Sequence, residues 1–156
     1  MTRKDLLALI GFYLPCLVVQ GVGGAITATS VSNWYQDIAK STLTPPGYWF
    51  GIVWTILYIL MAIAAWRVWR VERTVRSEAQ LLWIGQLVTG LLWTTTFFGM
   101  KQMHEGLAII ACLWLLIACT LRRFYKIDRL AGRLLVPLLL WVSFATYLQA
   151  MIVTLN

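Results

Sequence analysis

The sequence predicts an all-α membrane protein that folds as a bundle of five transmembrane helices. Hydrophobic residues make up 60% of the 156 residues and charged residues only 12%, and the mean hydropathy is +0.76. Soluble domains carry about 25% charged residues. The charges are also clustered, so that five stretches contain no Asp, Glu, Lys or Arg: residues 6–36, 41–66, 79–100, 106–121 and 134–156.

Four of these stretches reach the roughly 20 residues that a helix needs to cross a bilayer. The remaining one, residues 106–121, is shorter, but Arg122 and Arg123 at its end can extend their side chains to the lipid headgroups. We therefore expect a single domain over residues 1–156 with no soluble part. Its five helices are expected at about residues 5–28, 47–71, 78–100, 105–125 and 132–155.

The basic residues predict how the bundle is oriented. With five spans, Lys40 and Lys101 fall on the side of the C-terminus. The other eleven of the 13 basic residues fall on the side of the N-terminus: Arg3, Lys4, Arg67, Arg70, Arg73, Arg76, Arg122, Arg123, Lys126, Arg129 and Arg133. Cytoplasmic loops carry the excess of Lys and Arg. We expect a cytoplasmic N-terminus and an outer C-terminus in a bacterial cell membrane. The net charge of +7 then reflects topology and contact with anionic lipid, not nucleic-acid binding.

The first apolar stretch allows two interpretations. Two basic residues, an apolar core and small residues at 25–28 also fit a signal peptide, whose cleavage would leave four spans. The charge distribution fits five spans, which favours an uncleaved helix. Within this helix, Gly21, Gly23 and Gly24 would let another helix approach closely.

Residues 34–61 lead from a polar loop through a double proline into a helix rich in aromatic side chains. Each proline fixes its own φ and pushes the preceding residue towards extended geometry, so the loop enters the helix at a constrained angle. Trp54 and Tyr58 lie four residues apart and share one helical face. The stretch suits the lid and wall of a pocket for a flat apolar ligand. An aromatic belt at the membrane interface is the alternative, and it suits Trp49 and Phe50 better.

The third and fifth helices carry similar stripes. One stripe consists of Gln86, Gly90, Trp93 and Phe97, and the other of Trp141, Ala145 and Gln149. A small residue beside an aromatic ring leaves space that a ligand could fill. Ordinary helix–helix packing gives the same spacing, so both interpretations stay open.

Several classes of chemistry have no residues to carry them. The sequence contains no glycine-rich phosphate loop and no Ser-His-Asp set, and none of its six acidic residues is expected in the middle of the membrane. Acid–base catalysis and proton relay inside the bilayer are therefore not expected. No metal site or required cofactor is expected either, because His104 is the only histidine and the three cysteines fall within apolar stretches.

Three groups of residues, taken in order along the chain, resemble the tryptophan-rich sensory protein family, which includes the translocator protein, also called the peripheral benzodiazepine receptor. They are Trp34-Tyr35 with Pro45-Pro46 and Trp54-Thr55-x-Leu57-Tyr58, then Gln86-Leu87 with Trp93 and Phe97-Phe98-Gly99, then Pro137 with Trp141 and Phe144-Ala145-Thr146. The ordered set covers nearly the whole chain.

The resemblance implies a five-helix membrane bundle, often a homodimer, that binds porphyrins such as protoporphyrin IX or haem. Some members also bind benzodiazepine-type drugs or cholesterol. Carried over by position, the ligand site beneath the first loop would consist of Trp34, Tyr35, Pro45, Trp54, Tyr58, Gly90, Trp93, Thr94, Trp141 and Ala145. Aromatic rings stack on a flat macrocycle, which agrees with this assignment.

Departures from the family pattern weaken parts of this expectation. Gly90 stands where the family commonly has Asn, which removes an amide that could bind a ligand. No basic residue follows Arg133, so the family's C-terminal cholesterol motif is incomplete and sterol is the least supported ligand. Sensing, sequestration and passage of porphyrin all remain open. Two other functions are an enzyme that degrades porphyrin oxidatively in light, with Trp54 and Trp141 as its catalytic residues, and a structural helper without a small ligand.

Overall fold

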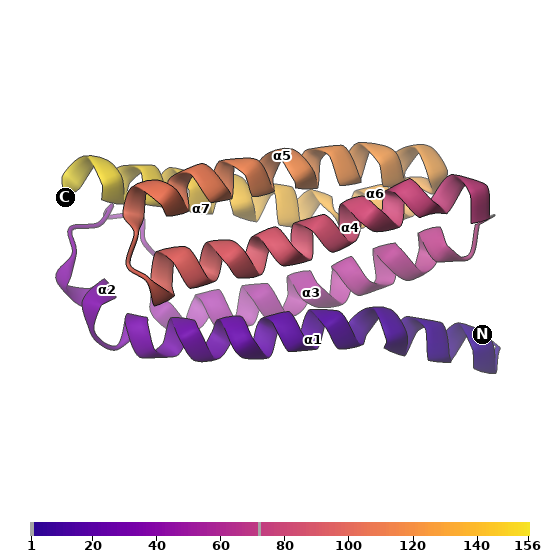
Figure 1. Ribbon diagram of the computed structural model, residues 1–156, viewed down its shortest axis with the longest axis horizontal. Coiled ribbons are helices and arrows are strands. Elements are labelled where there is room, and N and C mark those ends of the chain that lie inside the picture. The colour runs from indigo at the N-terminus through magenta and orange to yellow at the C-terminus, as the bar shows by residue number, and fades with distance from the viewer. Residues whose placement is uncertain (1, 72) are drawn as a thin grey trace.

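Five long, antiparallel helical spans form one bundle, with the N-terminus at one end and the C-terminus at the other (Figure 1). The structure, a computed structural model, describes residues 2–71 and 73–156, and for residues 73–76 only the backbone. The spans comprise α1 (Arg3–Val31), α3 (Gly47–Trp69), α4 (Arg73–Thr94) with the π-helical segment Thr95–Gly99, α5 (Met103–Ile127), and α6 (Arg129–Leu134) with α7 (Val136–Leu155). All five are long and apolar enough to cross a membrane, and no described residue is in a strand, which confirms the predicted fold class.

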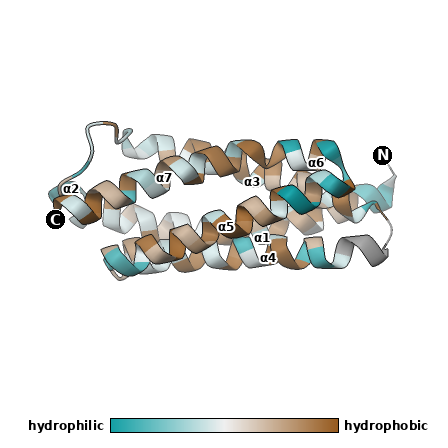
Figure 2. Ribbon diagram, turned by 90° about the horizontal axis from the view of Figure 1, so that it is seen from above, coloured by the Kyte–Doolittle hydropathy of each residue, from teal (hydrophilic) through white to brown (hydrophobic). Residues whose placement is uncertain are grey.

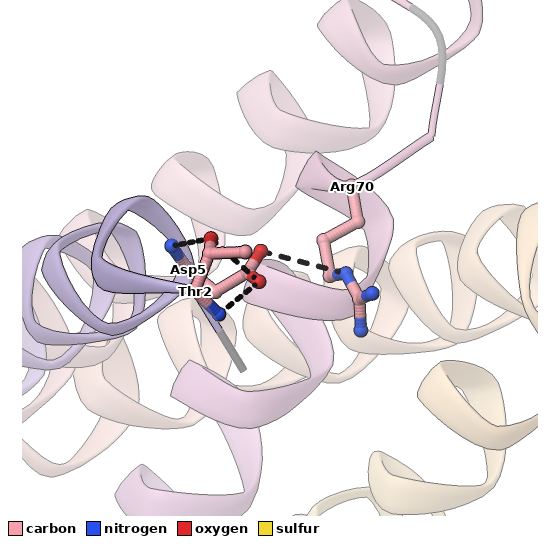
Figure 3. A network of polar contacts seen from close by, with 3 residues as sticks. All are labelled: Thr2, Asp5 and Arg70. Atoms are coloured by element: carbon pink, nitrogen blue, oxygen red, sulfur yellow. Dashed lines mark hydrogen bonds and ion pairs between the residues drawn. The ribbon is translucent and has the colours of Figure 1, made fainter.

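Helix α1 begins earlier than expected because the chain caps it. The Thr2 side chain accepts a hydrogen bond from the Asp5 backbone N–H (3.2 Å), and the Asp5 carboxylate accepts one from the Thr2 N–H (2.9 Å). This reciprocal pair is a capping box, which satisfies N–H groups that the first helical turn leaves without partners. Asp5 also faces Arg70 at the end of α3, with 3.7 Å between carboxylate and guanidinium (Figure 3).

The first loop, residues 32–46, contains a short helix that the sequence did not indicate, α2 (Trp34–Asp37). Lys40 caps it from beyond its end, because its ammonium donates to the backbone carbonyls of Gln36 (3.1 Å) and Ile38 (2.9 Å), and also to that of Tyr35. A cation at a helix C-terminus satisfies free carbonyls and opposes the negative end of the dipole. The Asn156 amide also exchanges two hydrogen bonds with the Ala39 backbone, each 3.0 Å, and ties the loop to the end of α7.

The last span is broken where one continuous helix over 132–155 was expected. A separate turn, α6, precedes α7, with the break at Leu135. Asp128 caps α6 by accepting from two backbone N–H groups at 2.8 and 3.0 Å. Pro137 lies in the first turn of α7, where its missing N–H costs no hydrogen bond. The third span likewise changes to π-helical geometry at Thr95 before it ends at Gly99.

The packing order explains which helices can share a site. Helix α1 packs against α3 and α4, α4 against α5, and α5 against α6 and α7, while α6 contacts α3. Little of α1 is buried, so this helix lies at the outside of the bundle. Hydrophobic residues run along the middle of the spans, with hydrophilic residues gathered towards the ends (Figure 2).

Most ionic contacts lie at the end that holds the N-terminus. Arg67 pairs with Asp128 at 2.8 Å, and Arg123 pairs with Glu78 at 2.7 Å. The α3–α4 turn and α6 lie at this same end in Figure 1, which agrees with the expected gathering of basic residues. Of the eleven residues assigned to this side, Arg73 and Arg76 have side chains outside the described residues.

Candidate functional site

A cavity of about 450 Å³, here called the main cavity, lies between α1, α3 and α4. Drug-sized ligands occupy pockets of about 300–1,000 Å³, so its size suits a small organic molecule. From α1 the lining residues are Val19, Gln20, Gly23, Gly24, Thr27, Ala28 and Val31; from α3, Gly47, Phe50, Gly51, Trp54, Thr55 and Tyr58; from the third span, Gly90, Trp93, Thr94 and Phe98.

Glycines keep this space open. A Cβ atom built on Gly24 or Gly51 would meet no atom within 4 Å, and one on Gly90 would meet only Leu113, at 4.0 Å. Gly23, next to Gly24 on α1, lies near the Thr94 side chain, which a Cβ would contact at an ordinary 3.6 Å. A Cβ atom would therefore fit at each of these positions, and its absence leaves that space open to a ligand.

Aromatic rings form the wall on the α3 and α4 side. The Trp54 and Tyr58 rings lie 5.5 Å apart, centroid to centroid, at an interplanar angle of 31°. Trp54 also lies 6.4 Å from Trp93, at 37°. These small angles present neighbouring ring faces, on which a flat ligand can stack.

Trp93 is held in place from behind. Its indole N–H donates to the side-chain carbonyl of Gln149 on α7 (2.6 Å), and the Gln149 amide donates to the Met103 backbone carbonyl (3.1 Å). Both partners are buried, with 6% of Trp93 and 2% of Gln149 exposed. Phe97 stacks on Trp93 at 5° between planes. The chain thus fixes one ring of the cavity wall through contacts that do not involve a ligand.

The polar groups of the main cavity are neutral. Gln20 donates through its amide N–H to the Thr55 hydroxyl (2.5 Å), which links α1 to α3. The carbonyl oxygen of Gln20 is buried and finds no hydrogen-bond partner in the described part of the chain. None of the described lining residues carries a charge. The described lining therefore offers a ligand apolar surface and neutral polar groups.

Five residues predicted for the ligand site line the main cavity: Trp54, Tyr58, Gly90, Trp93 and Thr94. The other five do not line it: Trp34, Tyr35, Pro45, Trp141 and Ala145. Of the two tryptophans expected to act in oxidative degradation, one therefore lies at the cavity and the other does not.

Most of these outlying residues lie one layer behind the wall. Trp34 packs edge-on against Phe97 (5.7 Å), and Tyr35 lies 5.6 Å from Phe98, a lining residue. Trp141 packs edge-on against Phe50, another lining residue, at 5.7 Å. The side chain of Ala145 is buried in the bundle core, with 6% exposed. The first loop therefore contacts aromatic rings of the third span through Trp34 and Tyr35.

The sequence did not indicate that α1 forms a whole wall. Gln20, Gly24, Thr27 and Val31 lie four, three and four residues apart and so share one helical face. Polar and small side chains on one face of an otherwise apolar span are the signal that could have found this wall. Of the α1 glycines that were expected to admit a neighbouring helix, Gly23 lies close to Thr94 of α4, whereas Gly21 and Gly24 border open space.

Comparison with known proteins agrees with this architecture. Residues 12–155 match the model of the TspO/MBR family. The tryptophan-rich sensory protein of Cereibacter sphaeroides is 40% identical over 124 residues, which cover 80% of this chain and 77% of that protein. The tryptophan-rich protein TspO of Chlorobaculum tepidum is 37% identical, with 90% of each chain covered. The translocator protein of Homo sapiens is 31% identical, and the match covers 90% of this chain and 85% of that protein. With five membrane-length helices, this chain is an integral membrane protein that belongs to the TspO/MBR family.

Proposed function

We propose that the chain binds a flat tetrapyrrole, protoporphyrin IX or a haem-type porphyrin, in the main cavity, for sensing, sequestration or passage of the ligand. The observation that supports this most is the combination of open glycine positions on α1 and α3 with the tilted rings of Trp54, Tyr58 and Trp93. The macrocycle would stack on the rings while its edge occupies the space that the glycines leave.

Binding, not degradation, is the function that the site favours. The lining offers a macrocycle apolar contact and neutral polar groups. Degradation in light was expected to use Trp54 together with Trp141, and only Trp54 lines the cavity. A structural helper would have no use for a cavity of about 450 Å³ at its membrane-facing helix.

The proposal extends to the setting of the protein. We propose a cytoplasmic N-terminus in a bacterial cell membrane, supported by the basic residues at that end of the bundle. A homodimer, and benzodiazepine-type drugs as further ligands, are proposed on the family resemblance. Sterol stays outside the proposal, because no basic residue follows Arg133.

Filling the cavity from its α1 wall tests the proposal. In Gly24→Leu, the added side chain enters open space, so the free protein should stay folded, but a bound macrocycle would be overpacked. Overpacking costs about 1–3 kcal/mol, which corresponds to an affinity for protoporphyrin IX about 5- to 150-fold lower.

Gly21→Leu is the matched control. Gly21 lies on the same helix and also has open space around it, but it does not line the cavity. Both variants gain a similar helix propensity, up to about 1 kcal/mol, from the loss of glycine. Titration of purified wild type and both variants, followed by porphyrin absorbance, should show loss of affinity in Gly24→Leu alone. Equal affinities in all three proteins would refute binding in this cavity.

A further inference from the structure

Gln86 is a buried amide that the bundle does not use. It lies on α4 with 2% of its surface exposed. Neither its amide nitrogen nor its carbonyl oxygen has a hydrogen-bond partner in residues 2–71 and 73–156. Most buried polar groups in proteins are hydrogen-bonded, and an unpartnered one is costly. Gln86 therefore needs an explanation that packing alone does not give.

A second, smaller space adjoins this amide. The inner cavity, about 10 Å³, lies where α3, α4, α5 and α7 meet. Its lining residues are Trp54, Tyr58, Met61, Gln86, Leu87, Gly90, Leu113, Ile117 and Leu138. Such a volume accommodates one group of about the size of a water molecule.

The inner and main cavities share part of their walls. Trp54, Tyr58 and Gly90 line both. Gly90 lies one helical turn from Gln86 on α4, and its missing side chain leaves the Leu113 side chain 4.0 Å from where a Cβ would be. A ligand that stacks on Trp54 in the main cavity therefore has its inner edge next to the space that Gln86 lines.

The surroundings of Gln86 restrict what can bind there. Apart from the amide itself, the described residues around the inner cavity offer apolar surface, the Trp54 indole and the Tyr58 phenol, and none of them is charged. A charged group placed there would lose its hydration without gaining a counter-ion, which is strongly unfavourable. An amide has one donor group and one acceptor, so its best complement is a neutral group that has both.

We propose that Gln86 forms a polar subsite at the inner end of the main cavity, where it binds a neutral, water-sized ligand group that both donates and accepts a hydrogen bond, such as a hydroxyl. The inference rests on the proposed function in one respect, because the ring that carries this group has to enter the main cavity. It adds a requirement on the ligand: its leading edge is neutral and polar, while any carboxylate stays outside the inner cavity.

Two probes of matched shape test the subsite. 2-Naphthol carries the required hydroxyl, and 2-methylnaphthalene replaces it with an apolar group of similar size. Gln86→Met keeps most of the side-chain shape and removes the amide. The variant should bind 2-naphthol at least about fivefold more weakly, because the buried hydroxyl loses its partner, while its affinity for 2-methylnaphthalene should be unchanged or higher.

Gln80→Met is the control on the same helix. Gln80 donates to the Ala65 carbonyl (3.0 Å) and lines neither cavity, so its loss should leave both affinities unchanged. Thermal unfolding of the ligand-free proteins gives a second measurement. Gln86→Met should not lower the melting temperature, because the amide it removes is unpartnered, whereas an amide with a purely structural role would leave a destabilised protein.

Three results would overturn the subsite: equal changes for both probes, unchanged affinities for both, or a lower melting temperature without discrimination between them. Failure of wild-type protein to bind either probe would overturn it as well. Titration of the same preparation with protoporphyrin IX then separates the two proposals. Porphyrin binding without discrimination at Gln86 would leave the main cavity as the ligand site and refute the subsite alone.

Discussion

The hydrogen bond between Trp93 and Gln149 should couple the cavity wall to the stability of the bundle. The indole N–H of Trp93 lies 2.6 Å from the Gln149 carbonyl oxygen, and both side chains are buried. Gln149→Leu removes the acceptor and leaves the indole N–H without its partner. A buried donor left unsatisfied costs about 1–3 kcal/mol, whereas hydrogen bonds between membrane helices average about 0.6 kcal/mol and reach about 1.7.

We therefore expect Gln149→Leu to lower the free energy of unfolding by about 1–2 kcal/mol. Because Trp93 lines the main cavity, affinity for protoporphyrin IX should also fall several-fold in this variant. A double-mutant cycle with Trp93→Phe, which keeps a ring but lacks the N–H, isolates the pairwise interaction. Unfolding in denaturing detergent should give an interaction energy of at least about 0.5 kcal/mol.

A second indole on the outside of the bundle is the control for this cycle. Trp114 on α5 donates to the Ser143 hydroxyl of α7 (2.7 Å), but Ser143 is exposed. The cycle of Trp114→Phe and Ser143→Ala should give a smaller interaction energy and leave porphyrin affinity unchanged. If the buried pair proves additive within about 0.3 kcal/mol, Trp93 is not fixed by this bond and the reasoning is refuted.

Three further predictions concern the two ends of the bundle. Lys40→Met removes the cap of α2 and should raise amide hydrogen exchange in the first loop, and unchanged exchange would show that the cap does not order it. Burial raises the pKa of Asp128, but backbone N–H groups of α6 and the Arg67 guanidinium lower it more, so its pKa lies below the usual value of about 4. The stability that the Asp128 carboxylate contributes is present above that usual value and is lost as pH falls through the lowered pKa. The melting temperature of Asp128→Asn should therefore change less between pH 3 and pH 5 than that of the wild type. Equal changes in the two proteins would contradict this. A reporter fused after Asn156 should be active on the non-cytoplasmic side, and activity in the cytoplasm would reverse the orientation.

The fold could be predicted from the sequence because the hydropathy of the chain largely determines it. Charge-free stretches long enough to cross a bilayer identify the spans, and each expected helix has a counterpart. The helix ends were less predictable, because they depend on individual caps. Thr2 with Asp5 extends α1, and Lys40 stabilises a turn, α2, in a segment expected to be a plain loop. Such caps are side-chain contacts that hydropathy does not report.

The candidate site was predictable only in part, because periodicity gives the direction of a side chain but not its depth. Trp54 and Trp93, which were expected at the ligand site, line the cavity. Trp141 shares the same kind of pattern, yet Phe50 stands between it and the open space. The position of the cavity depends on where neighbouring helices leave a gap between them. The glycines of α1 form this gap together with those of α3 and α4. No single helix contains this information.

An experimental structure of the chain with protoporphyrin IX bound tests the central claim most directly. The account predicts the macrocycle between α1, α3 and α4, in contact with Trp54 and Trp93 and with its edge beside Gly24 and Gly51. A macrocycle held instead beneath the first loop against Trp34 and Ala145, or bound on the outer surface of the bundle, would contradict it.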